Sequence, residues 1–239
     1  MQFALNPHLD TDALSRQYRE RQRLQVRDIF TTETAEAITQ TLEHQVPWAF
    51  VHQDGDRARY YRAEEMAAMS AEDQRALMAR LYDGARKGYQ FAYNTYPMLD
   101  AYLEKWRQVP LLDQLLEFIN SPEMLDFIRR LTSRPDIIKG DAQATRYGAG
   151  QFLKKHDDRL DSEYRVAAYV LNFTRHWEPD WGGFLQFYDH EGDIEQGFLP
   201  RFNALNIFTV PQEHSVSPVA HYVPHQHQRY AITGWFRYR

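Results

Sequence analysis

The sequence predicts an α+β fold, because helix-forming patterns fill its first part and strand-forming patterns fill the rest. Residues 1–135 are mostly periodic at helical spacing, whereas residues 136–239 are short apolar and aromatic runs separated by Gly, Pro, Asn and Asp. Many short strands in series favour a double-sheet jelly roll, or double-stranded β-helix. No linker rich in Gly, Ser or Pro separates the parts, so we expect one domain over residues 1–239, with the helices bracing one sheet.

The helices of the first part are expected to begin at residues that cap well. Thr31-Thr32 precedes one apolar stripe, Ser70 precedes a second that ends before Gly88, and Ser121 precedes a third with Pro122 at its first helical position. The apolar residues at helical spacing are Ala35, Ile38 and Leu42, then Leu77 and Leu81, then Leu111, Leu112, Leu115, Leu116 and Ile119, then Met124, Phe127, Ile128 and Leu131. These stripes predict helices that cover a sheet rather than a cofactor site.

The strands are expected where apolar and aromatic residues alternate or run together between turn residues. In the first part this pattern covers residues 48–53 and 89–98. In the second part it covers residues 142–147, 152–158, 164–173, 184–189, 204–210 and 228–238.

Composition excludes several classes of function. The 239 residues contain no cysteine, which rules out disulfides, thiolate zinc sites and cysteine nucleophiles. The net charge of -5 argues against nucleic-acid binding, and we interpret the Arg-rich run from Arg16 to Arg27 as a solvated helix face. The sequence has no apolar run for a membrane span and no signal-peptide pattern at its start, so we expect a cytoplasmic protein that does not contact a membrane.

A His-x-Asp pair predicts part of a metal site. Side chains alternate along a strand, so His156 and Asp158 point the same way and Asp157 points oppositely. His214, after the strand at 204–210, would add a third ligand, and three ligands on one side of Fe(II) leave positions open for a co-substrate and dioxygen. Taken alone, a strand histidine is more often only hydrogen-bonded in place.

The group His221, His225 and His227 is a rival metal site. These histidines are closer together in the sequence than the proposed three, but their surroundings, AHYVPHQHQRY, are typical of a polar loop. We favour the interpretation that this loop is solvated.

One face of the last expected strand is suited to a dicarboxylate. The period of two places Arg229, Ala231, Thr233 and Trp235 together. A guanidinium binds a carboxylate through two parallel hydrogen bonds, Thr233 adds a donor, and the small Ala231 leaves space.

At this point the residues resemble the iron(II)- and 2-oxoglutarate-dependent dioxygenases, and among them the prolyl-hydroxylase-like branch. The resemblance runs from Tyr147 to the carboxyl terminus and rests on TRYGAGQFLKKHDD, YVLNF, WGGFL, HSVSPV and RYAITGWF. It implies Fe(II) ligands at His156, Asp158 and His214. The cofactor-binding residues that it implies, for a 2-oxoglutarate co-substrate, are Arg229, Tyr147, Thr233 and Trp235, with Val216 as an apolar pocket residue and Val170 where the oxygen-sensing hydroxylases have a second tyrosine. Tyr169 is then expected to face away.

The resemblance implies a hydroxylase that uses Fe(II), 2-oxoglutarate and O2, with no catalytic side chain beyond the metal centre. A carboxylate at Asp158 favours hydroxylation over halogenation, and the family implies a prolyl residue of a protein or peptide as substrate. Tyr60, Tyr61, Tyr93 and Tyr96 are candidates to line the approach, with packing as their alternative role. A hydroxylase of a free amino acid or other small metabolite, and a jelly roll that binds without catalysis, remain as alternatives, and the oligomeric state stays open.

Overall fold

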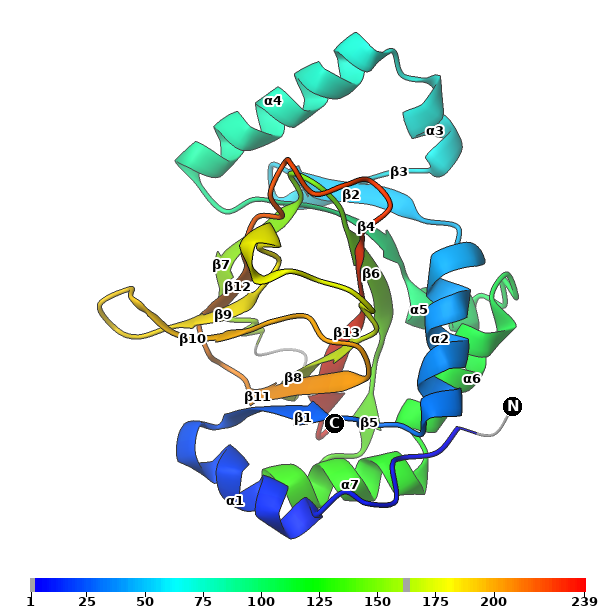
Figure 1. Ribbon diagram of the computed structural model, residues 1–239, viewed down its shortest axis with the longest axis vertical. Helices are drawn as coiled ribbons and strands as arrows, with labels where there is room; N and C mark the ends of the chain where they lie inside the picture. Colours follow the sequence, from blue (N-terminus) through cyan, green and yellow to red (C-terminus); the bar gives the residue numbers. More distant parts are fainter. Residues whose placement is uncertain (1–2, 161–163) are drawn as a thin grey trace.

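The computed structural model describes residues 3–160 and 164–239, and its centre is a curved sheet flanked by helices (Figure 1). The strands are β1 (Arg23–Arg27), β2 (Ala49–Asp54), β3 (Arg57–Tyr61), β4 (Phe91–Tyr96), β5 (Lys139–Gly140), β6 (Gln143–Tyr147), β7 (Phe152–His156), β8 (Arg165–Asn172), β9 (Leu185–Tyr188), β10 (Ile194–Phe198), β11 (Ala204–Thr209), β12 (His214–Val216) and β13 (Arg229–Arg237). The helices are α1 (Thr11–Arg21), α2 (Thr32–His44), α3 (Ala63–Ala68), α4 (Ala71–Lys87), α5 (Met98–Leu103), α6 (Pro110–Ile119), α7 (Pro122–Thr132) and the short 3-10 turn η2 (Pro179–Trp181).

The sheet topology confirms the predicted jelly roll. Hydrogen-bonded neighbours follow the order β1-β11-β8-β13-β6-β4-β7-β12-β9-β10, with β2 and β3 added beside β4 and β5 beside β13. Strand β4 pairs antiparallel with β6 through residues 94–96 and with β7 through residues 91–92, both along the edge opposite β2, so it joins the two halves of the roll. The helical part of the chain therefore contributes strands to the sheet as well as support.

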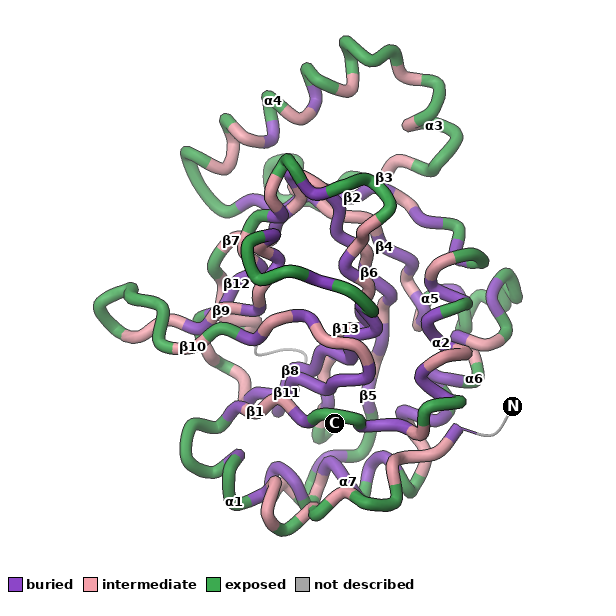
Figure 2. The backbone as a smooth tube through the Cα atoms, viewed as in Figure 1, coloured by how far each residue is buried: buried purple, intermediate pink, exposed green. Residues whose placement is uncertain are grey.

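The helices cover one face of the longer half of the sheet, as the apolar stripes predict. Helices α2, α5 and α6 lie along its outer side, α1 and α7 lie beside β1, and α3 and α4 lie beyond β2 and β3 (Figure 1). Figure 2 shows β8 buried along almost all of its length, β13 alternating between buried and intermediate residues, and α3 and α4 largely exposed. The predicted caps are present, since the side chains of Thr31, Ser70 and Ser121 each accept a hydrogen bond from a backbone N–H of the helix that follows.

Strand β13 separates two environments because its side chains alternate. Ile232 and Phe236 pack in the core beneath the helices, whereas Ala231 and Trp235 pack with Val170 inside the roll. The interior of the roll is therefore the place where side chains from β6, β7, β8, β12 and β13 meet.

The interpretation of the Arg-rich run as a solvated helix face is wrong for its second half. Residues Arg23–Arg27 form β1, an edge strand that pairs with β11. The side chain of Arg23 is buried and forms an ion pair with Glu195. Among the described residues, no helix is long and apolar enough to cross a membrane.

Candidate metal centre

His156, Asp158 and His214 converge at one end of the roll. His156 ends β7, Asp158 follows two residues later, and His214 opens β12 directly opposite His156 in the antiparallel pairing. The Nε2 atom of His156 lies 3.3 Å from Oδ1 of Asp158, and Nε2 of His214 lies 3.4 Å from Oδ2. One ligand atom from each residue lies within 4.8 Å of the others, and in the described parts of the chain this is the one group of its kind.

Both histidines present Nε2 to the shared centre because Nδ1 is engaged elsewhere. Nδ1 of His156 lies 2.9 Å from the carbonyl oxygen of Lys154, and Nδ1 of His214 lies 2.8 Å from that of Gln212. A carbonyl oxygen only accepts, so each Nδ1 carries the proton and each Nε2 keeps its lone pair for a metal.

Burial and neighbouring charges set the protonation of this group. Burial, reinforced by the nearby His156, lowers the pKa of His214 to about 4, so His214 is neutral at pH 7. Burial alone would raise the pKa of Asp158, but its contacts with the two histidines outweigh burial and lower it. Burial also disfavours protonated His156, yet the hydrogen bond and charge of Asp158 raise the pKa of His156. An anionic carboxylate between two imidazoles is a donor set that suits Fe(II).

Arg229 is a buried cation at the deep end of the same cavity. Its side chain is only 1% exposed, and its Nε and Nη1 atoms have no hydrogen-bond partner among the described residues. Its guanidinium lies over the ring of Tyr147, 5.0 Å from the ring centroid, and burial lowers its pKa. A buried guanidinium with free donors is costly unless an anion binds it, so this arrangement fits a carboxylate.

The cavity between Arg229 and the histidine pair encloses about 270 Å³. The residues named from the sequence that line it are His156, Asp158, His214, Arg229, Tyr147, Thr233, Trp235, Val170, Val216, Tyr93 and Tyr169. Although Tyr169 borders the cavity, its ring packs on the opposite face, 4.9 Å from Phe236, and its hydroxyl donates to the carbonyl oxygen of Asp141. The residues predicted from the sequence therefore line this cavity both around the metal group and around Arg229.

Arg165 and Tyr89 also line the cavity and were not identified from the sequence. Arg165 donates from Nη1 to the carbonyl oxygen of Asp158 at 3.0 Å, and its guanidinium lies 3.7 Å from the ring centroid of Trp235. Alternation along β8 would place Arg165 on the same face as Tyr169. The pairing with β13 shifts register beside Arg237, however, and this shift allows the side chain of Arg165 to point towards the cavity. Tyr89 follows α4, and its ring lies 5.8 Å from that of His156.

The other aromatic and histidine candidates lie apart from this group. His221 contacts the ring of Tyr82 and His227 contacts that of Trp181, so the rival histidines do not converge on one point. Of the four tyrosines proposed for the approach, Tyr93 lines the cavity, while Tyr60 and Tyr96 line a neighbouring groove. Tyr61 stacks on His52.

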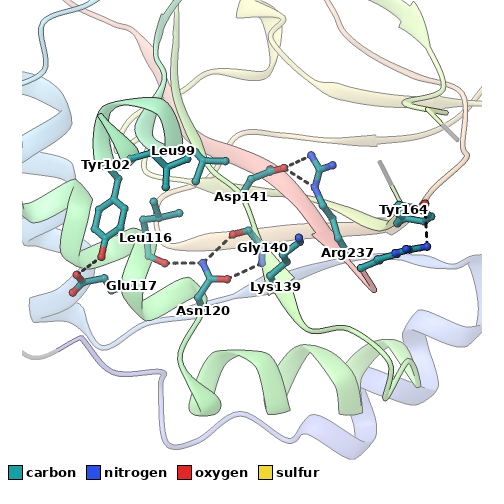
Figure 3. Close-up of a pocket in the computed structure, with 12 residues that line it drawn as sticks. Leu99, Tyr102, Leu116, Glu117, Asn120, Lys139, Gly140, Asp141, Tyr164 and Arg237 are labelled. Carbon is teal, nitrogen blue, oxygen red and sulfur yellow. Dashed lines mark hydrogen bonds and ion pairs between the residues drawn. The ribbon is translucent and has the colours of Figure 1, made fainter. Parts of the chain in front are cut away.

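A larger cavity of about 1000 Å³ lies near the carboxyl end of β13 (Figure 3). Several of its polar side chains are bonded to one another or to backbone: Arg237 pairs with Asp141, Tyr102 donates to Glu117, and Asn120 bonds the backbone of Gly140. Size alone therefore does not make it the candidate site.

Comparison with known proteins shows which family the part of the chain around the site resembles. Residues 142–237 match the family model of the 2OG-Fe(II) oxygenase superfamily. A curated mouse protein, prolyl 3-hydroxylase OGFOD1, is 30% identical over 103 residues, a match that covers 40% of this chain and 18% of the mouse protein. The resemblance to the prolyl-hydroxylase-like 2-oxoglutarate oxygenases, expected from the motifs, is confirmed.

Solved structures confirm the fold. A prolyl-4-hydroxylase from Pseudomonas putida superposes with a TM-score of 0.58 at 16% identity, over 99% of this chain and 96% of that chain. A prolyl hydroxylase from Trichoplax adhaerens, solved with a peptide of the hypoxia inducible factor oxygen degradation domain, also has a TM-score of 0.58 at 16% identity, over 95% of this chain and 88% of that chain.

Proposed function

We propose that this chain, whose residues 142–237 match the 2OG-Fe(II) oxygenase superfamily, is an iron(II)- and 2-oxoglutarate-dependent hydroxylase. The observation that carries the proposal is the pairing of two features in one cavity, a His-Asp-His group and a buried arginine with unpaired donors. We assign His156, Asp158 and His214 as the iron ligands. The geometry of their Nε2 and carboxylate atoms supports this assignment.

We assign Arg229 as the partner of the 2-oxoglutarate carboxylate that is remote from the metal. Its free Nε and Nη1 atoms support this role, and Thr233 and Tyr147 add hydroxyl groups to the same cavity. Val170 and Trp235 complete the walls. Their apolar surface excludes water, which strengthens the electrostatic attraction between the guanidinium and an anion.

The iron and 2-oxoglutarate, when bound, would supply the oxidising chemistry that inserts oxygen into a C–H bond. The residues of the chain would bind and orient the metal and the co-substrate. The Nδ1–H bonds fix the imidazoles, and Arg229 fixes one end of the dicarboxylate. No acid or base beyond the metal centre is assigned.

As substrate we propose a prolyl residue of a protein or peptide. The name of the mouse relative and the peptide in the Trichoplax adhaerens structure support this choice. We also propose that the whole chain acts as one domain, supported by the pairing of β1 and β4 from the helical part with β11 and β6 of the second part.

The test is iron-dependent formation of succinate from 2-oxoglutarate by the purified chain. We expect wild type to form succinate, Asp158→Ala to form none, and Arg229→Gln to raise the KM for 2-oxoglutarate on the order of 100-fold, since a buried charge partner is lost. Arg175→Gln, which removes a surface ion pair with Glu36, should leave the KM unchanged. Equal KM values for Arg229→Gln and wild type would contradict the assignment.

A further inference from the structure

A groove of about 720 Å³ lies beside the metal cavity and is lined by aromatic rings and prolines. Its rings come from separate segments: Trp48 before β2, Tyr60 on β3, Tyr96 at the end of β4 and Trp106 after α5. Pro47 and Pro97 lie among them, together with the acidic Glu64 and Asp100 and the basic Arg62.

The rings of the groove are held in place from behind, and two of them reach solvent. Trp106 packs edge-on against Tyr96 at 6.2 Å, and its Nε1 donates to Glu104. Trp48 lies against Tyr230 at 6.1 Å. Tyr60 is 56% exposed and Trp106 is 41% exposed, so the groove presents preorganised aromatic surface outward.

One row of paired residues leads across the sheet from the groove towards the metal cavity. Tyr60 pairs with Val51 across β3 and β2, and Val51 pairs with Tyr93 across β2 and β4. Residues directly opposite in antiparallel strands point to the same side. The ring of Tyr93 then stacks on that of Tyr147 at 5.0 Å, and Tyr147 pairs with Arg229.

A hydrogen bond joins the walls of the two spaces. Thr95 lines the groove, Gln143 lines the metal cavity, and Oγ1 of Thr95 donates to Oε1 of Gln143 at 3.2 Å. The two residues lie on the neighbouring strands β4 and β6. A polypeptide bound in the groove would therefore lie next to the cavity that holds the candidate ligands.

We propose that this aromatic groove (Trp48, Tyr60, Tyr96, Trp106) binds an extended, proline-containing segment of the substrate polypeptide, next to the residue presented at the metal centre. The inference rests on the proposed function. An extended proline-rich segment has no internal hydrogen bonds, loses little entropy on binding and docks its rings on aromatic-lined grooves. Glu64 and Asp100, against the single Arg62, favour a basic residue in that segment.

The test measures binding of decaproline to the full chain without 2-oxoglutarate, by tryptophan fluorescence and calorimetry. We expect saturable binding that an alternating Gly/Ser peptide of equal length does not show. Tyr60→Ala and Trp106→Ala should each weaken binding by about tenfold or more, because each removes an aromatic anchor. The matched control is Leu103→Ala, since Leu103 is 66% exposed near Trp106 but lines the other cavity.

The proposal is overturned if decaproline binds no better than the Gly/Ser peptide, or if Tyr60→Ala and Trp106→Ala bind it as wild type does. Succinate formation without peptide is measured in parallel and should be the same in all these variants. Loss of succinate formation in wild type, with decaproline binding intact, would contradict the proposed function and leave the docking groove standing.

Discussion

His156 and His214 are paired residues of adjacent antiparallel strands, and their ring centroids lie 4.2 Å apart. The register of β7 and β12 therefore sets the relative position of two of the three candidate ligands. Asp158 completes the group from a left-handed backbone conformation, with φ of 60°. The backbone thus brings together residues that are far apart in the sequence.

We predict that His156→Ala and His214→Ala each abolish tight binding of Fe(II), because two remaining ligands hold the metal weakly. The measurement is anaerobic titration of the metal-free chain by calorimetry. His190→Ala is the control, since the side chain of His190 is 90% exposed and lies outside the group. Loss of binding in His225→Ala, with binding retained in His214→Ala, would show that the rival histidine loop holds the metal.

We predict that Arg165 positions Asp158. Its bond to the Asp158 carbonyl oxygen and its stacking on Trp235 hold a backbone conformation that few residues other than glycine adopt. Arg165→Met should weaken Fe(II) binding by about 10- to 100-fold, as the loss of a residue that orients a ligand usually does. The control is Arg159→Met, whose ion pair is with the outward-facing Asp157. Equal metal affinity in Arg165→Met and wild type would contradict the positioning role of Arg165.

The periodicity of the sequence was sufficient to predict the main elements but not several short strands. Helices α2, α4 and α7 follow the expected caps and stripes, α6 follows its expected stripe, and β6, β8, β11 and β13 fall within the expected ranges. Strands β1, β3, β5, β10 and β12 were not expected. Each of these strands is short, and β1 is rich in arginine. Pairing with a neighbouring strand, rather than a local apolar pattern, therefore determines their extended conformation.

The candidate site was predictable where it depends on alternation within one strand. Arg229, Thr233 and Trp235 share a face of β13, and all line the cavity. Arg165 was not predictable because the direction of its side chain depends on a register shift against β13. The aromatic groove was not predictable either, because its rings come from segments that only the folded chain brings together.

We predict that Gly234→Ala destabilises the fold by about 3 kcal/mol or more, because a Cβ there would lie 2.0 Å from the carbonyl oxygen of Asp141, and a backbone atom cannot move aside as the end of a flexible side chain can. Gly88→Ala is the matched control, since a Cβ at Gly88 meets nothing within 4 Å. It should change the free energy of unfolding by about 0.5 kcal/mol or less. Urea unfolding followed by circular dichroism measures both, and similar midpoints would contradict the expectation.

Arg23 connects the first strand of the sheet to the segment that carries His214. Its Nη1 donates to Oε1 of Gln212 at 3.1 Å, and the carbonyl oxygen of Gln212 accepts from Nδ1 of His214. The guanidinium also lies over the ring of Phe187, 4.8 Å from its centroid, and that ring packs against His214. Loss of Arg23 should therefore loosen a candidate ligand as well as the edge of the sheet.

We predict that Arg23→Met lowers the free energy of unfolding by about 1–2 kcal/mol, a modest loss because the partner carboxylate of Glu195 stays partly solvated. Fe(II) affinity should fall several-fold, since His214 loses the support of Gln212. Arg27→Met is the matched control on the same strand, because Arg27 is exposed, and it should change neither quantity. If Arg23→Met lost stability but kept full metal affinity, Arg23 would support the sheet edge alone.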